Sequence, residues 1–437
     1  MPNSPAIDPN EIRIEAVETT YPDTKYEFVL PTKCVQQITD RLDEQKQKME
    51  GPRLYDLLAH ICYEEAVSRF DLEPIWQFTI PPMKKPLALE PGDDFIFFGI
   101  IDSPQEITWP DFSTLNIERP LMEISEALVN AELEEQCLDA GKQIPSTKPL
   151  ASGDEATGHA WLGSVDTNEV FIDKDAISVR IPAKGQPALV EGIPIANLAE
   201  ALQGSVAGDQ IEVDFEVSGF EGMPELTGST LTCRFDIKET HHIEPTTVEE
   251  VVALYGSPSE AGLRQQIYHS LELRFQREQM VWVNENVLAQ VESLVDITIP
   301  IRIIEDDVRR QQEMYAKSLS EAGLDGDEIK SKINASIDVY KSRSLQRTRR
   351  HAINVLLQRH FKIKVDERDL LAHIQLLADM RGESPEIVRK ELVESELINQ
   401  VATKCTECKI VEHILSVANV TDARVDPGSF SFGGLES

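Results

Sequence analysis

Two cysteines three residues apart, Cys405 and Cys408, have the spacing in this 437-residue chain that most suggests chemistry. A CxxC pair can supply two ligands of a structural zinc site or form a redox-active dithiol. A structural zinc needs four ligands, and apart from His413 the neighbouring sequence offers no second CxxC or pair of histidines. A redox CxxC opens a helix after a strand, whereas this pair lies inside a helical pattern. The sequence therefore favours two cysteines that pack on one helix face, with a zinc or thiol site as the alternative.

The adjacent histidines His241 and His242 form a second candidate, at the end of a β-rich region. We predict a hinge between two domains there, and a metal site is the alternative. The signatures GxSxG, HExxH and the P-loop are absent from the sequence. We therefore expect no metal, no cofactor and no conventional hydrolytic or phosphoryl-transfer site.

The chain is strongly acidic, since 42 Lys and Arg residues against 76 Asp and Glu residues give a formal net charge of −34. This balance argues against polyanionic partners, so we expect neither DNA nor a membrane surface. The exception is Lys330–Lys364, which holds ten Lys or Arg residues and one acidic residue, Asp338. The tract lacks the aromatic interleaving that stacks on bases. It is predicted to be a helix face paired with acidic neighbours, and a nucleic-acid site is the alternative.

No targeting signal is readable in the sequence. The first residues contain no basic segment followed by an apolar one, and no apolar run reaches the roughly 18 residues of a membrane helix. Six cysteines in so long a chain do not make a disulfide framework. We therefore expect a cytoplasmic protein.

The N-terminal part of the chain reads as an α+β domain. Alternating apolar residues predict a hairpin over residues 11–30, and apolar residues three to four apart predict a helix over residues 32–50. Gly51-Pro52 ends that helix, and a second helix follows. Further strands are expected over residues 76–80 and 95–101.

The rest of the chain changes character twice. After a polar helix over residues 126–140, residues 154–243 contain short β-rich runs and one short helix, and from Thr246 onward apolar residues recur at helical spacing. The predicted fold class is therefore multidomain α+β, with an inserted α+β domain and an all-helical C-terminal domain. The predicted boundaries are 1–118 for the N-terminal domain, 119–150 for a linker helix packed with the C-terminal domain, 151–243 for the inserted domain, 244–424 for the helical domain and 425–437 for a flexible tail.

The order of these parts resembles the trigger factor family of ribosome-associated chaperones over nearly the whole chain. The resemblance is carried by the opening segment IRIEAVETTYPDTKYEFVLPTKCVQQITDRLDE, the linker segment EITWPDFSTLNIERPLMEISEALVNAELEE and the arm segment RHAINVLLQRHFKIKVDERDLLAHIQLLADMRGESPEIVRKEL. Residues 153–239 are similar to the family's FK506-binding-type (FKBP-like) prolyl isomerase domain. No single motif carries the match, which lies in the order of all four parts.

This resemblance implies a chaperone that binds unfolded or nascent polypeptides in a helical cradle, with peptidyl-prolyl cis-trans isomerase activity in the inserted domain. It also implies a ribosome-binding-like N-terminal domain, a role in protein folding and transport, and either a monomer or a homodimer. The rival interpretation is a non-catalytic binding protein with a degenerate isomerase domain and no ribosome docking. A periplasmic chaperone of related design is a third.

The family's ribosome-docking loop, Gly-Phe-Arg-x-Gly-Lys between the first two helices, survives here as a remnant. The junction reads Lys48-Met49-Glu50 followed by Gly51, Pro52 and Arg53. The phenylalanine and the closing Gly-Lys are missing, and fewer cations mean less attraction to phosphate-rich RNA. We therefore predict weak or absent ribosome association.

The family's prolyl pocket is apolar and aromatic, and it desolvates and twists the X–Pro bond without a nucleophile. By resemblance, its positions are occupied here by Trp161, Ile177, Leu198, Phe220 and Cys233. Because leucine and cysteine stand where rings are expected, the resemblance implies a weakened isomerase. The alternative is that these are core residues of a degenerate domain.

Apolar residues exceed a single stripe in one part of the helical region, at Val281, Trp282, Val287, Leu288 and Val291. One helix can bury only one face against its neighbours. The surplus is predicted either to be covered by more protein or to line a concavity that binds clients, and the resemblance favours client binding.

Overall fold

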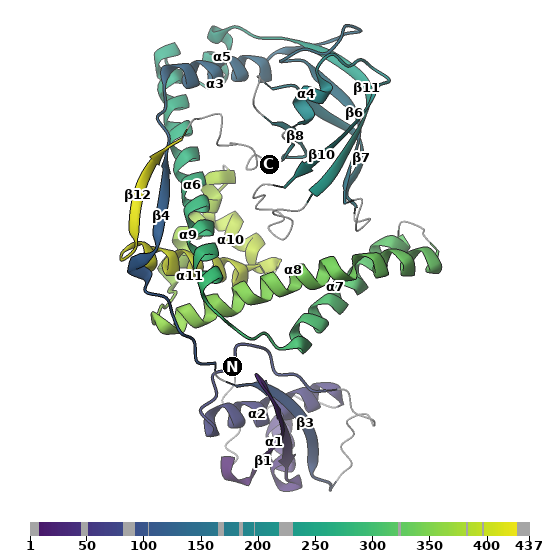
Figure 1. Cartoon of the computed structure of the whole chain (residues 1–437), viewed down its shortest axis with the longest axis vertical. Coiled ribbons are helices and arrows are strands. Elements are labelled where there is room, and N and C mark those ends of the chain that lie inside the picture. The colour runs from purple at the N-terminus through teal and green to yellow at the C-terminus, as the bar shows by residue number, and fades with distance from the viewer. Residues whose placement is uncertain are drawn as a thin grey trace. The chain divides into compact units, whose positions relative to one another are not determined.

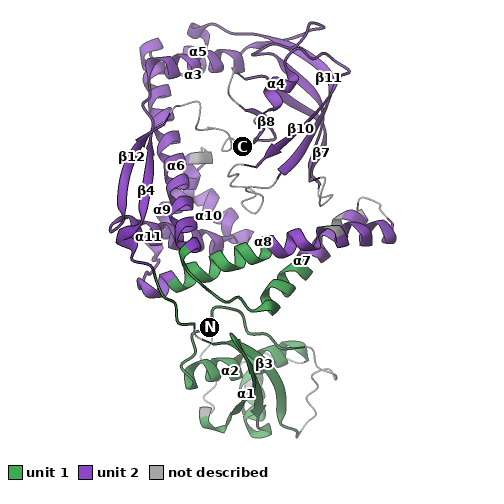
Figure 2. Ribbon diagram, viewed as in Figure 1, with its two compact units in different colours: residues 1–109, 294–310, 344–356 green, residues 110–293, 311–343, 357–437 purple. Residues whose placement is uncertain are grey.

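The chain forms two compact units. The computed structural model describes residues 8–44, 51–81, 92–103, 105–164, 170–182, 187–195, 197–217, 230–321, 325–381, 383–395 and 397–425. Unit 1 contains residues 1–109, 294–310 and 344–356, and unit 2 contains residues 110–293, 311–343 and 357–437 (Figure 2). Two segments from the predicted helical domain therefore belong to the same unit as the N-terminal residues. In the described ranges, no helix is both long enough and apolar enough to cross a membrane.

Unit 1 is built on an antiparallel sheet of three strands, β1 (Arg13–Thr20), β2 (Asp23–Leu30) and β3 (Phe95–Asp102), with β2 in the centre. Helices α1 (Thr32–Glu44) and α2 (Pro52–Arg69) lie against this sheet (Figure 1). Side chains of both helices and of the sheet form one buried apolar cluster. The predicted hairpin and two helices are confirmed, although residues 45–50 of the first predicted helix lie outside the described residues.

The strand expected over residues 76–80 is wrong. That segment makes one isolated bridge, between Thr79 and Ile100. Its apolar alternation is real, but Pro81 follows directly, and a proline cannot donate a ladder hydrogen bond.

Polar side chains attach residues 294–310 to the sheet of unit 1. Arg302, in the first turn of α7 (Ile301–Glu321), donates from Nε and Nη2 to the carboxylate of Asp23 at 2.9 and 3.0 Å. Gln105 and Thr298 exchange two hydrogen bonds, at 2.9 and 3.1 Å. Bidentate Arg–carboxylate pairs fix orientation as well as distance, so this attachment is geometrically specific.

In unit 2 a long-range strand pair joins distant parts of the chain. Strand β4 (Asn116–Leu121) pairs in parallel with β12 (Asn419–Arg424). The short helix η2 (Phe112–Thr114) comes just before β4, whereas helix α3 (Glu126–Asp139) and the inserted domain lie between β4 and β12 in sequence. Ser125 caps α3 by accepting a hydrogen bond from the Leu128 amide.

The inserted domain is a sheet with one short helix. The strands are β5 (Lys142–Pro145), β6 (Glu155–Gly163), β7 (Val170–Arg180), β10 (Gln210–Glu216) and β11 (Thr230–Glu244). Their order is β10-β11-β6-β7, and β5 also pairs with β11. A hairpin of β8 (Ala188–Val190) and β9 (Ile193–Ile195) and helix α4 (Leu198–Leu202) complete the domain. Among the predicted β-rich runs, residues 170–180 form one continuous strand.

Helices make up most of the chain after the insertion: α5 (Val248–Leu254), α6 (Glu260–Leu294), α7, α8 (Gly326–His360), α9 (Glu367–Arg381), α10 (Pro385–Glu394) and α11 (Ile398–Leu415). Capping boxes start α5, through Thr247 and Glu250, and α8, through Asp325 and Glu328. Helix α10 begins with Ser384 at the N-cap position and Pro385 in its first turn, where proline is favoured. The fold is thus multidomain α+β with a helical C-terminal part.

Candidate functional site

The sheet of the inserted domain has an apolar inner face and a polar outer face. Along β6, Ala156, Ala160 and Leu162 are fully buried, whereas His159 and Trp161 between them are half-buried. This alternation is the period of two that a strand imposes on its side chains. The inner face packs against α4, and the outer face carries the charged residues.

The inner face gathers three of the predicted prolyl-pocket residues. Ile177 of β7, Leu198 of α4 and Cys233 of β11 belong to one buried cluster, and Leu198 and Cys233 are 0% exposed. Burial raises the pKa of the Cys233 thiol to about 12, so this sulfur stays protonated and packs as an apolar group. Phe220 lies outside the described residues.

The structure does not bring Trp161 together with that cluster. The β6 residue that pairs with Cys233 and faces the inner cluster is its neighbour, Leu162. A shift of one residue along a strand moves a side chain to the opposite face. Trp161 therefore lies on the outer face, across from the residues with which the family resemblance grouped it.

On the outer face, four side chains form one cross-strand row. Asp173, Trp161, Arg234 and Glu212 are successive Cα partners on β7, β6, β11 and β10. The Arg234 guanidinium carbon lies 4.7 Å from the centroid of the Trp161 ring. Arg234 Nε donates to Glu212 Oε2 at 2.6 Å, so one cation is held between a ring and a carboxylate.

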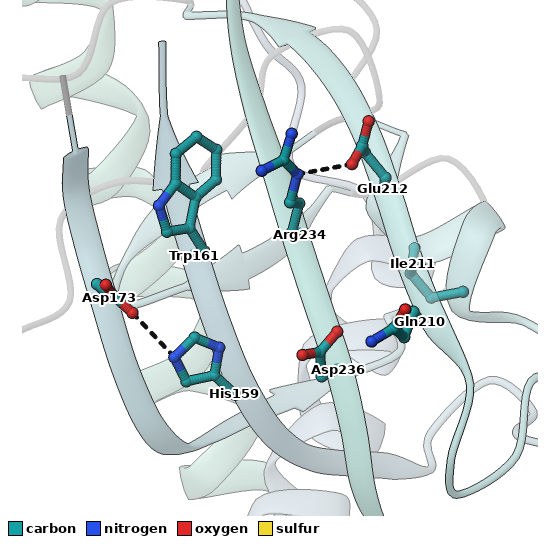
Figure 3. A pocket seen from close by; sticks show the side chains of 8 residues that line it. All are labelled: His159, Trp161, Asp173, Gln210, Ile211, Glu212, Arg234 and Asp236. Carbon is teal, nitrogen blue, oxygen red and sulfur yellow. Dashed lines mark hydrogen bonds and ion pairs between the residues drawn. The ribbon is translucent and has the colours of Figure 1, made fainter. Parts of the chain in front are cut away.

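A second row lies beside the first. His159, Asp236 and Gln210 are successive partners on β6, β11 and β10. His159 Nε2 is 2.9 Å from Asp173 Oδ1, which links the rows. Together with Ile211, the two rows line a pocket of 660 Å³, called here the outer-face pocket (Figure 3).

The outer-face pocket has the chemistry of a recognition site. Its lining, His159, Trp161, Asp173, Gln210, Ile211, Glu212, Arg234 and Asp236, contains no serine, threonine or cysteine that could act as a nucleophile. In the parts of the chain that the structure describes, no group of three or more His, Cys, Asp or Glu residues is placed to hold a metal ion. What remains is a ring, several charges and hydrogen-bonding groups.

Sequence reasoning missed this pocket, although a signal was present. Small apolar residues at Ala156, Gly158 and Ala160 alternate with polar or aromatic residues through Trp161. That alternation by itself places Trp161 with His159 on the solvent side.

The predicted ribosome-docking remnant lies at the start of α2. Gly51 precedes the helix with φ of 60°, Pro52 is its first residue, and the Arg53 side chain is exposed. Residues 48–50 of the junction lie outside the described residues.

The five predicted client-binding residues are largely covered by protein. Val287, Leu288 and Val291 of α6 are almost completely buried, and Val281 and Trp282 are half-buried. The sequence pattern predicts that this surplus apolar surface is either covered by protein or exposed in a concavity. Val287, Leu288 and Val291 are covered. Large exposed apolar side chains occur elsewhere on the helices, at Leu273, Met280, Ile301, Met314, Leu345, Leu371, Ile387 and Val393.

The candidate cysteines and histidines have structural surroundings. Cys405 is buried in the cluster of α9, α10 and α11, and Cys408 Sγ accepts a hydrogen bond from Asn284 Nδ2 at 3.6 Å. His241 and His242 lie within β11, where they pair with β5, and His242 Nδ1 is 2.7 Å from Asp154 Oδ1.

Part of the basic tract is paired as expected. Arg347 of α8 makes an ion pair with Asp307 of α7 at 2.5 Å. Arg349 donates to the backbone carbonyl of Val295 at 2.5 Å. These contacts match a helix face that is neutralised by its neighbours.

Comparisons with known proteins agree with this architecture. Residues 261–416 match the family model described as bacterial trigger factor protein C-terminus. A trigger factor of Rhodopirellula baltica is 23% identical over 403 residues, covering 91% of this chain and 80% of the relative. A trigger factor of Streptomyces avermitilis is 24% identical over 383 residues, covering 82% and 76%. A solved trigger factor chaperone structure covers 92% of this chain and 99% of its own, with 14% identity and a TM-score of 0.38.

The fold is that of a multidomain α+β protein with a helical C-terminal part, and residues 261–416 within that part match the trigger factor C-terminal family model. Together with the relatives, which are 23% and 24% identical over most of the chain, this match supports a divergent trigger factor.

Proposed function

We propose that this chain is a chaperone that binds unfolded or nascent polypeptides through exposed apolar side chains of its helical region. The observation that carries the proposal is the exposure of large apolar residues along α6 to α10, with Met314 73% and Ile301 71% exposed. Isolated exposed apolar residues are ordinary on protein surfaces, but a family of polypeptide-binding chaperones gives such residues a partner. Transient apolar contacts of this kind suit clients without a fixed shape.

A matched pair of variants tests where clients bind. Met314→Ser with Ile387→Ser removes exposed apolar surface from the helices, and Val170→Ser with Leu189→Ser removes exposed apolar surface from the inserted domain. We expect the first double variant to suppress aggregation of a denatured model protein less well, and the second to match the wild type. Equal loss in both variants would contradict the helical assignment.

A deletion variant tests the same assignment without the inserted domain. Pro145 of β5 and His241 of β11 are direct Cα partners, so a short Gly/Ser linker can join them after residues 146–240 are removed. We expect this variant to retain suppression of aggregation. A folded deletion variant that no longer suppresses aggregation would identify the inserted domain as the client-binding part.

We also propose that prolyl isomerase activity is present but weak. Support comes from the inner face, where Leu162, Leu198 and Cys233 offer aliphatic or thiol surface and are fully buried. Each lost ring contact worth about 1 kcal/mol in the transition state lowers the rate roughly fivefold. Isomerisation of a proline tetrapeptide measures this, and a rate equal to that of a family member with a complete aromatic pocket would refute it.

Ribosome association is proposed to be weak, in a cytoplasmic protein. Support comes from the exposed Arg53, which is the one cation of the remnant at Gly51, Pro52 and Arg53. Co-sedimentation with ribosomes at low and high salt tests the proposal. Binding that persists at physiological salt would show that other surfaces dock.

A further inference from the structure

We propose that the outer-face pocket of the inserted domain binds a lysine or arginine side chain of an extended polypeptide segment. That such a segment belongs to a client rests on the proposed function, whereas the binding of a basic segment does not.

Charge is the first argument. Asp173, Glu212 and Asp236 place three carboxylates around the pocket, and Arg234 supplies one guanidinium. The lining is therefore negative overall, because three carboxylates outnumber its basic side chains, Arg234 and His159. An anionic ligand would face three carboxylates, whereas a cation meets complementary charge.

Asp236 is the carboxylate with bonding capacity to spare. Asp173 is paired with His159, and Glu212 is paired with Arg234. The carboxylate of Asp236 has no hydrogen-bond or ion-pair partner among the described residues, and it lies beside His159 and Gln210 in the second row (Figure 3). A charge-assisted hydrogen bond from a ligand cation would satisfy it.

Trp161 is the second, independent argument. Its ring already attracts one cation, because the Arg234 guanidinium carbon lies 4.7 Å from its centroid. Indole rings are the preferred aromatic partners of Lys and Arg. Long basic side chains also need apolar surface for their stems, and the Trp161 ring supplies it inside the pocket.

The geometry suits one basic side chain and the backbone that carries it. Trp161 and Asp236 lie on neighbouring strands and in neighbouring rows, so their Cα atoms are separated by roughly one strand spacing and two residues, about 5 Å by 7 Å. A lysine side chain extended over the ring spans that interval. The remaining space of the 660 Å³ pocket is open to the rest of a peptide segment.

Fluorine NMR on the full chain can observe this binding directly. Labelling with 5-fluorotryptophan gives signals from Trp76, Trp109, Trp161 and Trp282, and Trp161→Phe assigns the relevant one. The probes are a Gly/Ser peptide with one central lysine and its counterparts with norleucine or glutamate. We expect the lysine peptide to shift the Trp161 signal until binding saturates and to leave the other three signals unchanged. The norleucine and glutamate peptides should bind at least about fivefold more weakly.

Matched variants separate the pocket from general charge. Asp236→Asn should weaken the lysine peptide about three- to tenfold, whereas Glu200→Gln, an equal charge change at an exposed position on α4, should leave it unchanged. Unchanged thermal unfolding of both variants shows that the fold is intact. Equal binding of the lysine and norleucine peptides, or equal effects of the two variants, overturns the inference.

Two outcomes separate this inference from the proposed function. The Met314→Ser/Ile387→Ser variant can lose suppression of aggregation while the lysine peptide still shifts its Trp161 signal as in the wild type. That result supports peptide binding in the outer-face pocket and shows that it does not depend on client binding by the helices. If the wild type suppresses aggregation but its Trp161 signal does not respond to the lysine peptide, the inference about the pocket is overturned and the proposed function stands. If the chain self-associates on concentration and Asp236→Asn abolishes that, a second copy is the occupant and the client assignment is overturned.

Discussion

The sheet of unit 1 and the sheet of the inserted domain are both antiparallel and covered by helix on one face, yet they use aromatic rings differently. In unit 1, Phe28 and Phe97 stack with centroids 4.8 Å apart, and Phe78 meets Phe28 edge-on at 5.8 Å. In the inserted domain the buried cluster is mainly aliphatic, and Trp161 lies on the outer face.

This difference suggests two uses for the same kind of side chain. Rings buried against each other contribute large contact areas and geometric preference to a core. A ring on a polar face adds little to the core but offers a surface for a ligand. The comparison predicts that removing rings from unit 1 costs stability, whereas removing Trp161 costs recognition.

The largest effect is expected at the centre of the aromatic core. Phe97→Ala should lower the free energy of unfolding of unit 1 by about 3–5 kcal/mol, because it leaves a cavity between Phe28 and Phe95. Phe98→Ala, one residue on and on the other face, should cost about 1 kcal/mol, mainly its contact with Lys25. Hydrogen exchange of the amides in unit 1 measures the loss of stability in both variants. Similar losses would contradict the expected difference between the buried and the outer face of the sheet.

The inner face of the inserted domain should behave as an aliphatic core. Leu198→Ala is expected to cost about 2–5 kcal/mol, because the residue is fully buried. Leu189→Ala, at a largely exposed position, should cost less than about 0.5 kcal/mol. Urea unfolding followed by hydrogen exchange compares them, and a small effect at Leu198 would indicate an open pocket.

Adding a ring to that core sharpens the contrast. Cys233→Phe should destabilise the inserted domain by about 1–3 kcal/mol, since the site is fully buried and the larger ring must displace its neighbours. Cys233→Val serves as the control of similar size. A stable Phe variant with faster isomerisation would show that the inner face can accommodate an aromatic pocket.

Removing the half-buried Trp161 ring from the outer face should change stability less than removing a core residue does. Trp161→Ala is expected to alter the free energy of unfolding by less than about 1 kcal/mol, the size of its contact with Arg234. Thermal unfolding measures this change. A loss comparable to that of Leu198→Ala would mean that Trp161 is a core residue.

Acidification should change the stability contributions of two carboxylates, Asp102 in unit 1 and Asp175 in the inserted domain, in opposite directions. Burial raises the pKa of Asp102 in unit 1, so its contribution to stability falls as pH rises above the ordinary value and recovers on acidification. Lys238 lowers the pKa of Asp175 on β7, so its contribution is present at neutral pH and lost as pH falls through the folded value. The free energy of unfolding of the wild type, Asp102→Asn and Asp175→Asn should be measured between pH 7 and pH 3. If it changes with pH in the same way in all three proteins, the two assignments are contradicted.

Local signals predicted most of the helices and the first hairpin. The start of α10 follows from the local preferences of Ser384 and Pro385 for the first positions of a helix. The strands β1 and β2 follow from the alternation of apolar and polar residues that one buried face requires. The same local reasoning could not decide whether Val287 and Leu288 are covered or exposed, because a helical pattern alone does not say which faces other segments cover.

The site was predicted less well than the fold. Ile177, Leu198 and Cys233 do meet in one cluster, but Trp161 was grouped with them by resemblance rather than by strand parity. At low identity a carried-over position can be wrong by one residue, and in a strand one residue reverses the face. The pocket also needs four strands in register, which no single segment encodes.

The pairing of β4 with β12 constrains when the molecule can be completed. Asn116 and Asn419, which are hydrogen-bonded to each other, are 303 residues apart. At synthesis rates of about 5–20 residues per second, β4 waits roughly 15–60 s for its partner strand. Throughout that interval β4 lacks the partner that completes its ladder, so this chain passes through an unfinished nascent state of its own.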